Sequence, residues 1–69
     1  MDILFSKKLY KEEAIDAAAA AFSDVADIFI TVGRDIIGVG IKGCAAEDKP
    51  LIQSEFSNYV LSEMRRPII

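Results

Sequence analysis

Residues 26–42 read ADIFITVGRDIIGVGIK, and this stretch decides the fold. Before the turn Gly33-Arg34-Asp35, aliphatic side chains occupy the even positions, and Phe29 lies among the odd ones. After the turn, aliphatic side chains occupy the odd positions 37, 39 and 41, and Ile36, Gly38 and Gly40 occupy the even ones. Such alternation is typical of a β-strand that is buried on one face. Because the turn has hairpin length, the stretch predicts two antiparallel strands, over 26–32 and 36–42.

Two segments with helical periodicity flank the hairpin. The first extends from about Lys11 to the pair Ser23-Asp24, with glutamates in its first turn, where the helix dipole favours negative charge. The second begins near Pro50, which suits a first helical turn, and Pro67 ends it. The pair Arg65-Arg66 complements the dipole at its C-terminal end. The predicted buried stripes consist of Ile15, Ala18, Ala19 and Phe22 in the first helix, and of Ile52, Phe56, Tyr59 and Val60 in the second.

A short apolar run over 3–5 predicts one further strand, so the element order is β-α-β-β-α. A right-handed crossover followed by the hairpin favours a three-stranded antiparallel sheet of order 1-3-2, with both helices on one face. We therefore expect a single α+β domain over residues 1–69. The other sheet face carries Leu4, Phe29, Thr31, Gly38 and Gly40, and no predicted element is left to cover it.

The size of the chain indicates that it needs a partner. A domain of 69 residues has a thin core, although 52% of its residues are hydrophobic. Its single cysteine cannot form an internal disulfide, and the sequence shows no cluster of metal ligands. Small domains that have neither a disulfide nor a structural metal often gain stability by association. We therefore expect a protein or peptide partner, or a second copy of the chain in a homodimer.

Charge and hydropathy argue against several classes of protein. The net charge is −3 and the eight basic residues are scattered, whereas nucleic-acid binders usually present a continuous basic stripe. The apolar run at 3–5 is too short for a secretory signal, and the alanine run at 17–21 is too short to span a membrane. A lone cysteine suits a reducing compartment. The expected localisation is cytoplasmic.

Three features resemble catalytic or binding motifs, and each has a simpler interpretation. Residues 38–43 match the dinucleotide fingerprint G-x-G-x-x-G, but these glycines fall inside the predicted strand rather than at a helix start. Cys44 has no histidine to activate it and has acidic neighbours. The paired carboxylates do not approach a calcium-binding spacing. The sequence therefore predicts no cofactor, no metal and no catalytic residues, and we expect a protein that is not an enzyme.

Two stretches together resemble a known family, the small D component of the His-Xaa-Ser peptide-maturation systems of bacteria. The residues that carry the resemblance are Lys8-Leu9-Tyr10, Glu13-Ala14-Ile15, Ala18, Phe22 and Asp24 in the first stretch, and Glu55-Phe56, Asn58, Val60-Leu61 and Arg65 in the second. The resemblance implies an accessory protein that accompanies radical S-adenosylmethionine (SAM) maturases and a precursor with His-Xaa-Ser repeats. It implies no catalytic residues. Tyr59 departs from the family pattern, in which an acidic residue is expected.

The leading hypothesis is a non-enzymatic adaptor that binds a radical SAM maturase or a precursor peptide through the open sheet face or a sheet edge. The expected partner-binding residues are Phe29, Thr31 and Gly38 on the sheet, with Asn58 and Arg65 as positions that the resemblance suggests on the second helix. Exposed apolar patches tend to mark interfaces. The alternative is a self-associating structural module that has no peptide ligand.

Overall fold

The computed structural model describes residues 2–65, and its element order confirms the predicted α+β fold. The elements are β1 (Ile3–Ser6), α1 (Glu12–Phe22), β2 (Asp27–Val32), β3 (Ile36–Lys42) and α2 (Lys49–Met64). Arg66 and Pro67, which were expected to complete and end the second helix, lie outside the described residues. Arg65 follows α2 directly, and its backbone N–H donates to the Leu61 carbonyl at 3.1 Å.

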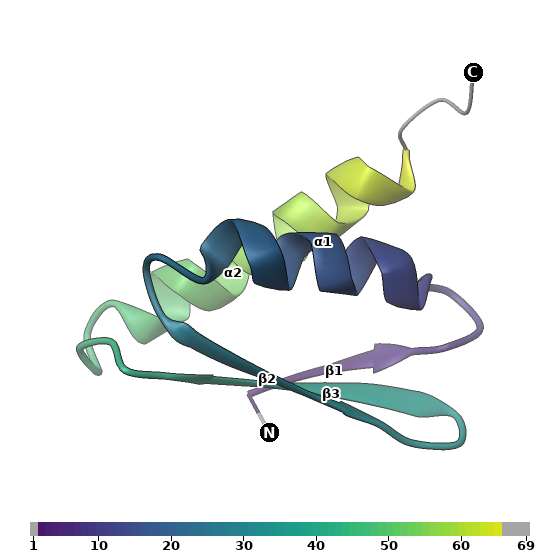
Figure 1. Ribbon diagram of the computed structural model, residues 1–69, viewed down its shortest axis with the longest axis horizontal. Coiled ribbons are helices and arrows are strands. Elements are labelled where there is room, and N and C mark those ends of the chain that lie inside the picture. Colours follow the sequence, from purple (N-terminus) through teal and green to yellow (C-terminus); the bar gives the residue numbers. More distant parts are fainter. Residues whose placement is uncertain (1, 66–69) are drawn as a thin grey trace.

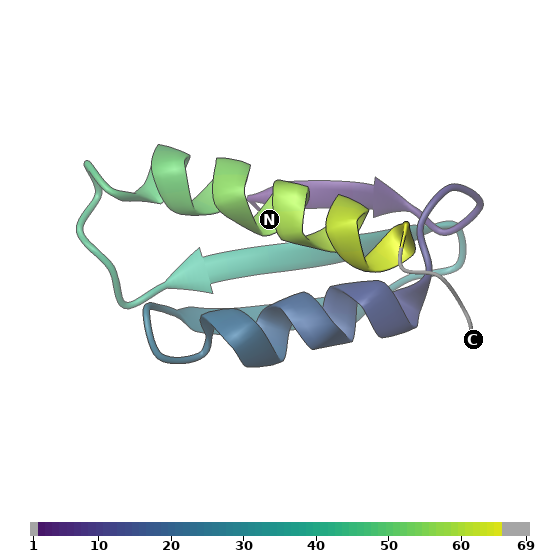
Figure 2. The same cartoon turned by 90° about the horizontal axis from the view of Figure 1, so that it is seen from above.

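The sheet has the predicted strand order β1-β3-β2, and both neighbouring pairs are antiparallel. The hairpin closes where the Gly33 N–H donates to the Ile36 carbonyl at 2.8 Å. The chain leaves β1, passes over the sheet through α1 and returns as β2, so β3 fits between the two outer strands (Figure 2). The alternating pattern of the hairpin sets the register, because slipping by one residue would expose the whole aliphatic set.

Both helices cover the same face of the sheet, as the alternation predicts (Figure 1). They run antiparallel, with α1 over β2 and α2 on the side of β1 (Figure 2). A direct contact joins the helix ends, since the Lys11 backbone N–H donates to Met64 Sδ at 3.2 Å. No described element lies on the opposite face of the sheet (Figure 1).

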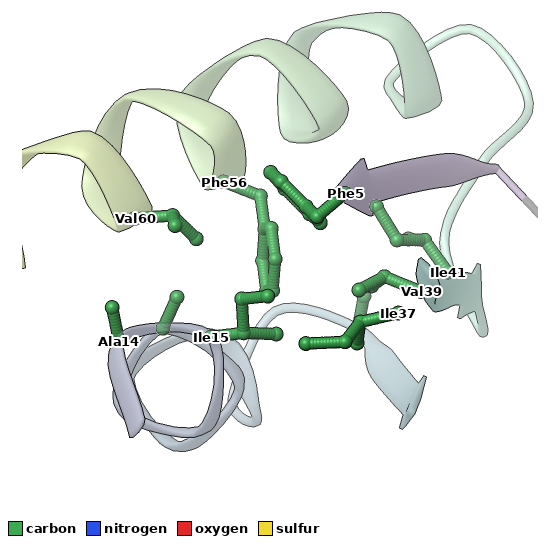
Figure 3. Packing of buried hydrophobic residues seen from close by; sticks show 10 residues of the cluster. Phe5, Ala14, Ile15, Ile37, Val39, Ile41, Phe56 and Val60 are labelled. Carbon is green, nitrogen blue, oxygen red and sulfur yellow. The ribbon is translucent and has the colours of Figure 1, made fainter. Parts of the chain in front are cut away.

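The core lies between the helices and the aliphatic face of the sheet. Phe56 is fully buried and points from α2 toward Ile15 and the sheet (Figure 3). Its ring centroid lies 5.5 Å from that of Phe22 and 6.4 Å from that of Phe5. The buried hydrophobic residues are Phe5, Ala14, Ile15, Ala18, Ala26, Ile37, Val39, Ile41, Phe56 and Val60.

One predicted core position is wrong. Tyr59 was expected in the buried stripe of α2, but it is 37% exposed. Phe56 and Val60 are one turn apart and point directly into the core, so Tyr59 lies on the flank of the helix. Its ring packs edge-on against Phe22 with a centroid distance of 5.9 Å. A tyrosine at such a rim keeps its hydroxyl close to water while its ring stays packed.

Asp2 links three parts of the fold. Its carboxylate accepts a hydrogen bond from the Ile41 backbone N–H at 2.6 Å and pairs with Lys49 Nζ at 2.9 Å. Asp2 therefore joins the start of β1 to the end of β3 and the start of α2. The hydrogen bond from Ile41, followed by the contact with Lys49, lowers the pKa of this carboxyl group.

Candidate functional site

The uncovered side of the sheet is the candidate site, and we call it the open face. Residues directly opposite each other in an antiparallel sheet share a face, so the register defines its members. The open face consists of Leu4 and Ser6 from β1, Asp27, Phe29 and Thr31 from β2, and Ile36, Gly38, Gly40 and Lys42 from β3.

Large apolar side chains of the open face are exposed to solvent. Leu4 is 63% exposed, Phe29 53% and Ile36 48%, one from each strand. Between them, Gly38 and Gly40 are buried although no helix covers them. Their burial follows from the pairing, because Gly38 lies between Leu4 and Thr31, and Gly40 lies opposite Phe29. The open face therefore has a low glycine floor bordered by apolar side chains.

Charged side chains lie only at the ends of the open face. Asp27 and Lys42 are opposite each other at one end, where Lys42 Nζ lies 5.8 Å from the centre of the Phe29 ring. The hairpin turn with Arg34 and Asp35 follows the other end. The middle of the face carries no charge and is mainly apolar, with Thr31 as its one hydroxyl, so a partner must match shape and apolar surface there, whereas the ends select for charge.

The open face is small. Three strands spaced about 4.8 Å apart, with about 3.4 Å per residue, give an area of about 14 by 20 Å for strands of this length. This area of about 300 Å² is less than half of the roughly 800 Å² that each partner contributes to a standard protein interface. The face thus suits a peptide segment or a small protruding element better than a broad globular surface.

The five predicted site residues fall on two separate surfaces. Phe29, Thr31 and Gly38 lie together on the open face, as the alternation predicted. Asn58 and Arg65 lie in or just after α2, are exposed, and belong to the layer that covers the other side of the sheet. A single small partner cannot contact both groups at once.

Leu4 and Ile36 are site residues that the predicted set omitted. The sequence had already placed Leu4 on the open face, and Ile36 falls there because it alternates with the buried positions of β3. Their large exposed fractions make them as prominent as Phe29. The strand alternation in the sequence assigns both residues to the open face, but the alternation does not say how far each side chain is exposed.

The apparent nucleotide motif consists of two strand glycines and a turn glycine. Gly38 and Gly40 lie within β3, and Gly43 follows it with a φ of 75°. Helix α2 begins only at Lys49, so no helix N-terminus meets the motif. Cys44 is half-buried and packs against the core. Residues 2–65 contain no group of three or more histidine, cysteine, aspartate or glutamate side chains placed to hold a metal ion.

Within the part of the chain that the structure describes, no helix has both the length and the apolar character needed to cross a bilayer. Comparison of the chain with protein-family models, with curated proteins and with solved structures gives no match. The candidate site therefore rests on its own geometry.

Proposed function

We propose that this protein is a non-enzymatic accessory protein that binds a segment of a partner protein on its open face. The resemblance to the D component of the His-Xaa-Ser systems suggests which partners to try, namely a radical SAM maturase or a precursor with His-Xaa-Ser repeats. The observation that carries the proposal is the exposure of Leu4, Phe29 and Ile36 on a sheet face that no described element covers.

Exposed apolar side chains are unfavourable in water, and covering them with a partner contributes favourably to the free energy of binding. Removing apolar surface from water contributes roughly 25 cal/mol per Å². Leu4, Phe29 and Ile36 are each about half exposed or more, so a bound partner segment removes a large apolar area from water. Ordering costs offset part of this gain, which favours a transient complex rather than a permanent one.

The binding test uses a matched pair of leucine substitutions. Leu4 on the open face is 63% exposed, and Leu51 on α2 is 61% exposed. Leu4→Ser and Leu51→Ser therefore remove similar exposed apolar area from opposite layers of the molecule. Titration calorimetry with a radical SAM maturase and with a His-Xaa-Ser repeat peptide measures the affinity of each variant.

We expect Leu4→Ser to weaken binding about tenfold, because it removes a large exposed apolar side chain from the open face, and Leu51→Ser to leave it unchanged. If instead Leu51→Ser weakens binding and Leu4→Ser does not, the interface is the α2 surface that carries Asn58 and Arg65. If neither the maturase nor the repeat peptide produces a heat of binding, the accessory role with these partners is contradicted. Light scattering on the same samples tests the self-association alternative, which a concentration-independent monomer excludes.

A further inference from the structure

The outer edge of β2 is unprotected. All six residues of β2 pair with β3 in continuous register, and within residues 2–65 no strand pairs with the other side of β2. Natural edge strands are usually shielded by proline, lysine, a bulge or short length. The sequence of β2, Asp-Ile-Phe-Ile-Thr-Val, contains no proline or lysine, and its register contains no bulge.

The register shows which main-chain groups point outward. Gly33 and Ile36 form a hydrogen-bonded pair, and such pairs alternate along an antiparallel ladder. Phe29 and Thr31 therefore direct their N–H and C=O groups toward β3. The N–H and C=O groups of Ile28, Ile30 and Val32 point away from the sheet, in the spacing that one further strand requires.

The other edge of the sheet, formed by β1, has fewer main-chain groups available for pairing with a further strand. β1 has only four residues. Just after β1, the Lys7 N–H donates to the Asp35 carbonyl, so by the same alternation the N–H and C=O groups of Leu4 and Ser6 point away from β3. The Ser6 carbonyl already accepts the N–H groups of Leu9 at 3.1 Å and Tyr10 at 2.9 Å. The turn after β1 thus occupies the Ser6 end of this short edge, and β2 is the longer edge left for pairing.

A second copy of this chain does not fit the β2 edge as an antiparallel strand. Two β2 strands paired antiparallel would lie about 4.8 Å apart, with the helices of both copies on the same side. Because α1 lies over β2, the two α1 helices would approach each other to about the same distance (Figure 2). Packed helices need an axial separation of at least about 8 Å. An extended peptide has no such helix.

We propose that an extended segment of the partner adds to β2 as a fourth, antiparallel strand; this inference rests on the proposed function and specifies how the part of the partner next to β2 binds, whereas the contact with Leu4 on β1 belongs to another part of the partner. Every second side chain of the segment lies on the open face beside Phe29 and Thr31, and the others lie on the side of α1. The β2 side chains beside it are Ile28, Ile30 and Val32 on the α1 side, and Phe29 and Thr31 in the middle of the open-face side, so the segment carries apolar or β-branched residues.

The ends of β2 carry opposite charges that set the ends of the segment. Asp24 and Asp27 are exposed at its start, and Arg34 is exposed just after its end. Lys42 and Asp35, the charges of opposite sign at these two ends, lie in or next to β3, one strand farther from the outer edge. An antiparallel segment places its own N-terminal end near Arg34 and its C-terminal end near Asp27. Charge complementarity therefore favours a segment that begins with an acidic residue and ends with a basic one.

The capped heptapeptide Glu-Val-Thr-Val-Tyr-Val-Lys is a probe built to these rules. In the proposed register its tyrosine lies opposite Phe29, its lysine opposite Asp27 and its central valine opposite Ile30. Titration into the isotope-labelled protein is followed by NMR. We expect saturable downfield shifts of the Ile28 and Ile30 amide protons, which gain hydrogen bonds, and smaller shifts of the Thr31 amide, which already has one.

Two N-methylated probes provide the matched control without altering the protein. Methylation of the central valine nitrogen removes a donor that faces Ile30, and should weaken binding about tenfold. Methylation of the tyrosine nitrogen, which faces away from β2, should leave the affinity within about twofold. Equal effects of the two methyl groups, or no saturable shift of the edge amides at millimolar probe, overturn strand addition.

The outcome is separable from that of the proposed function. If Leu4→Ser weakens partner binding while the probe leaves the edge amides unchanged, the open face binds the partner and strand addition is wrong. If the probe shifts the Ile30 amide as expected but neither candidate partner binds, the edge accepts a strand and the suggested partners are wrong.

Discussion

Phenylalanine-to-alanine substitutions on the two faces of the sheet should differ sharply in their effect on stability. Phe56 is fully buried between both helices and the sheet, whereas Phe29 is 53% exposed on the open face. Truncating a buried phenylalanine costs about 3–5 kcal/mol, because the cavity adds to the lost transfer free energy. Truncating Phe29 leaves no cavity and forfeits about half of the 1.5–3 kcal/mol of full burial, or about 1 kcal/mol.

The total stability decides what these losses do. At about 0.05–0.15 kcal/mol per residue, a chain of 69 residues has an unfolding free energy of about 3–10 kcal/mol. Phe56→Ala therefore removes much or all of the stability, and Phe29→Ala leaves the protein folded. Urea denaturation followed by circular dichroism measures both. Equal losses would refute the assignment of the faces, since they would mean that Phe29 is enclosed as fully as Phe56.

Three further predictions concern single positions. Because the pKa of Asp2 is lowered in the folded state, its contribution to stability is present above the unfolded pKa and is lost as pH falls through the folded value. Asp2→Asn should therefore flatten the fall in melting temperature below about pH 4. An unchanged slope would mean that the contacts of Asp2 with Ile41 and Lys49 do not stabilise the fold. Gly43→Ala should lower the free energy of unfolding by about 1–2 kcal/mol, because φ is 75° and the added Cβ would lie 2.7 Å from Asp27 Oδ2. If the second substitution Asp27→Ala fully restored the stability, the clash alone, and not the backbone conformation, would explain the loss. In hydrogen exchange, the Ile30 amide should exchange faster than that of Thr31, and the reverse order would mean that β2 is paired in another register.

Five of the fifteen residues that carry the family resemblance belong to the buried core. Ala14, Ile15, Ala18, Phe56 and Val60 are all buried. They interlock the two helices above the sheet, so a shared pattern at these positions reports how the layers pack. Exposed members of the pattern carry the information about a partner surface. The binding experiments therefore compare the α2 surface with the open face directly.

Local sequence patterns are enough to specify the layers of this protein. Strand alternation over residues 26–42 separates an aliphatic face from a face with Phe29 and glycines, and the helical periods supply two apolar stripes that can cover only one of them. These are local patterns, set by neighbours within one or two turns or strand repeats. For that reason the element order and the uncovered face were predictable, and the strand order followed from the general right-handedness of crossover connections.

Only the tertiary structure decided how distant segments meet. It places Asn58 on a layer away from Phe29, and it moves Tyr59 to the rim of the core. It also shows that the turn after β1 occupies one sheet edge while β2 keeps the other unpaired. Such features depend on contacts between residues far apart in the chain, where small shifts in helix position and loop path decide which groups come together, and no local period encodes them.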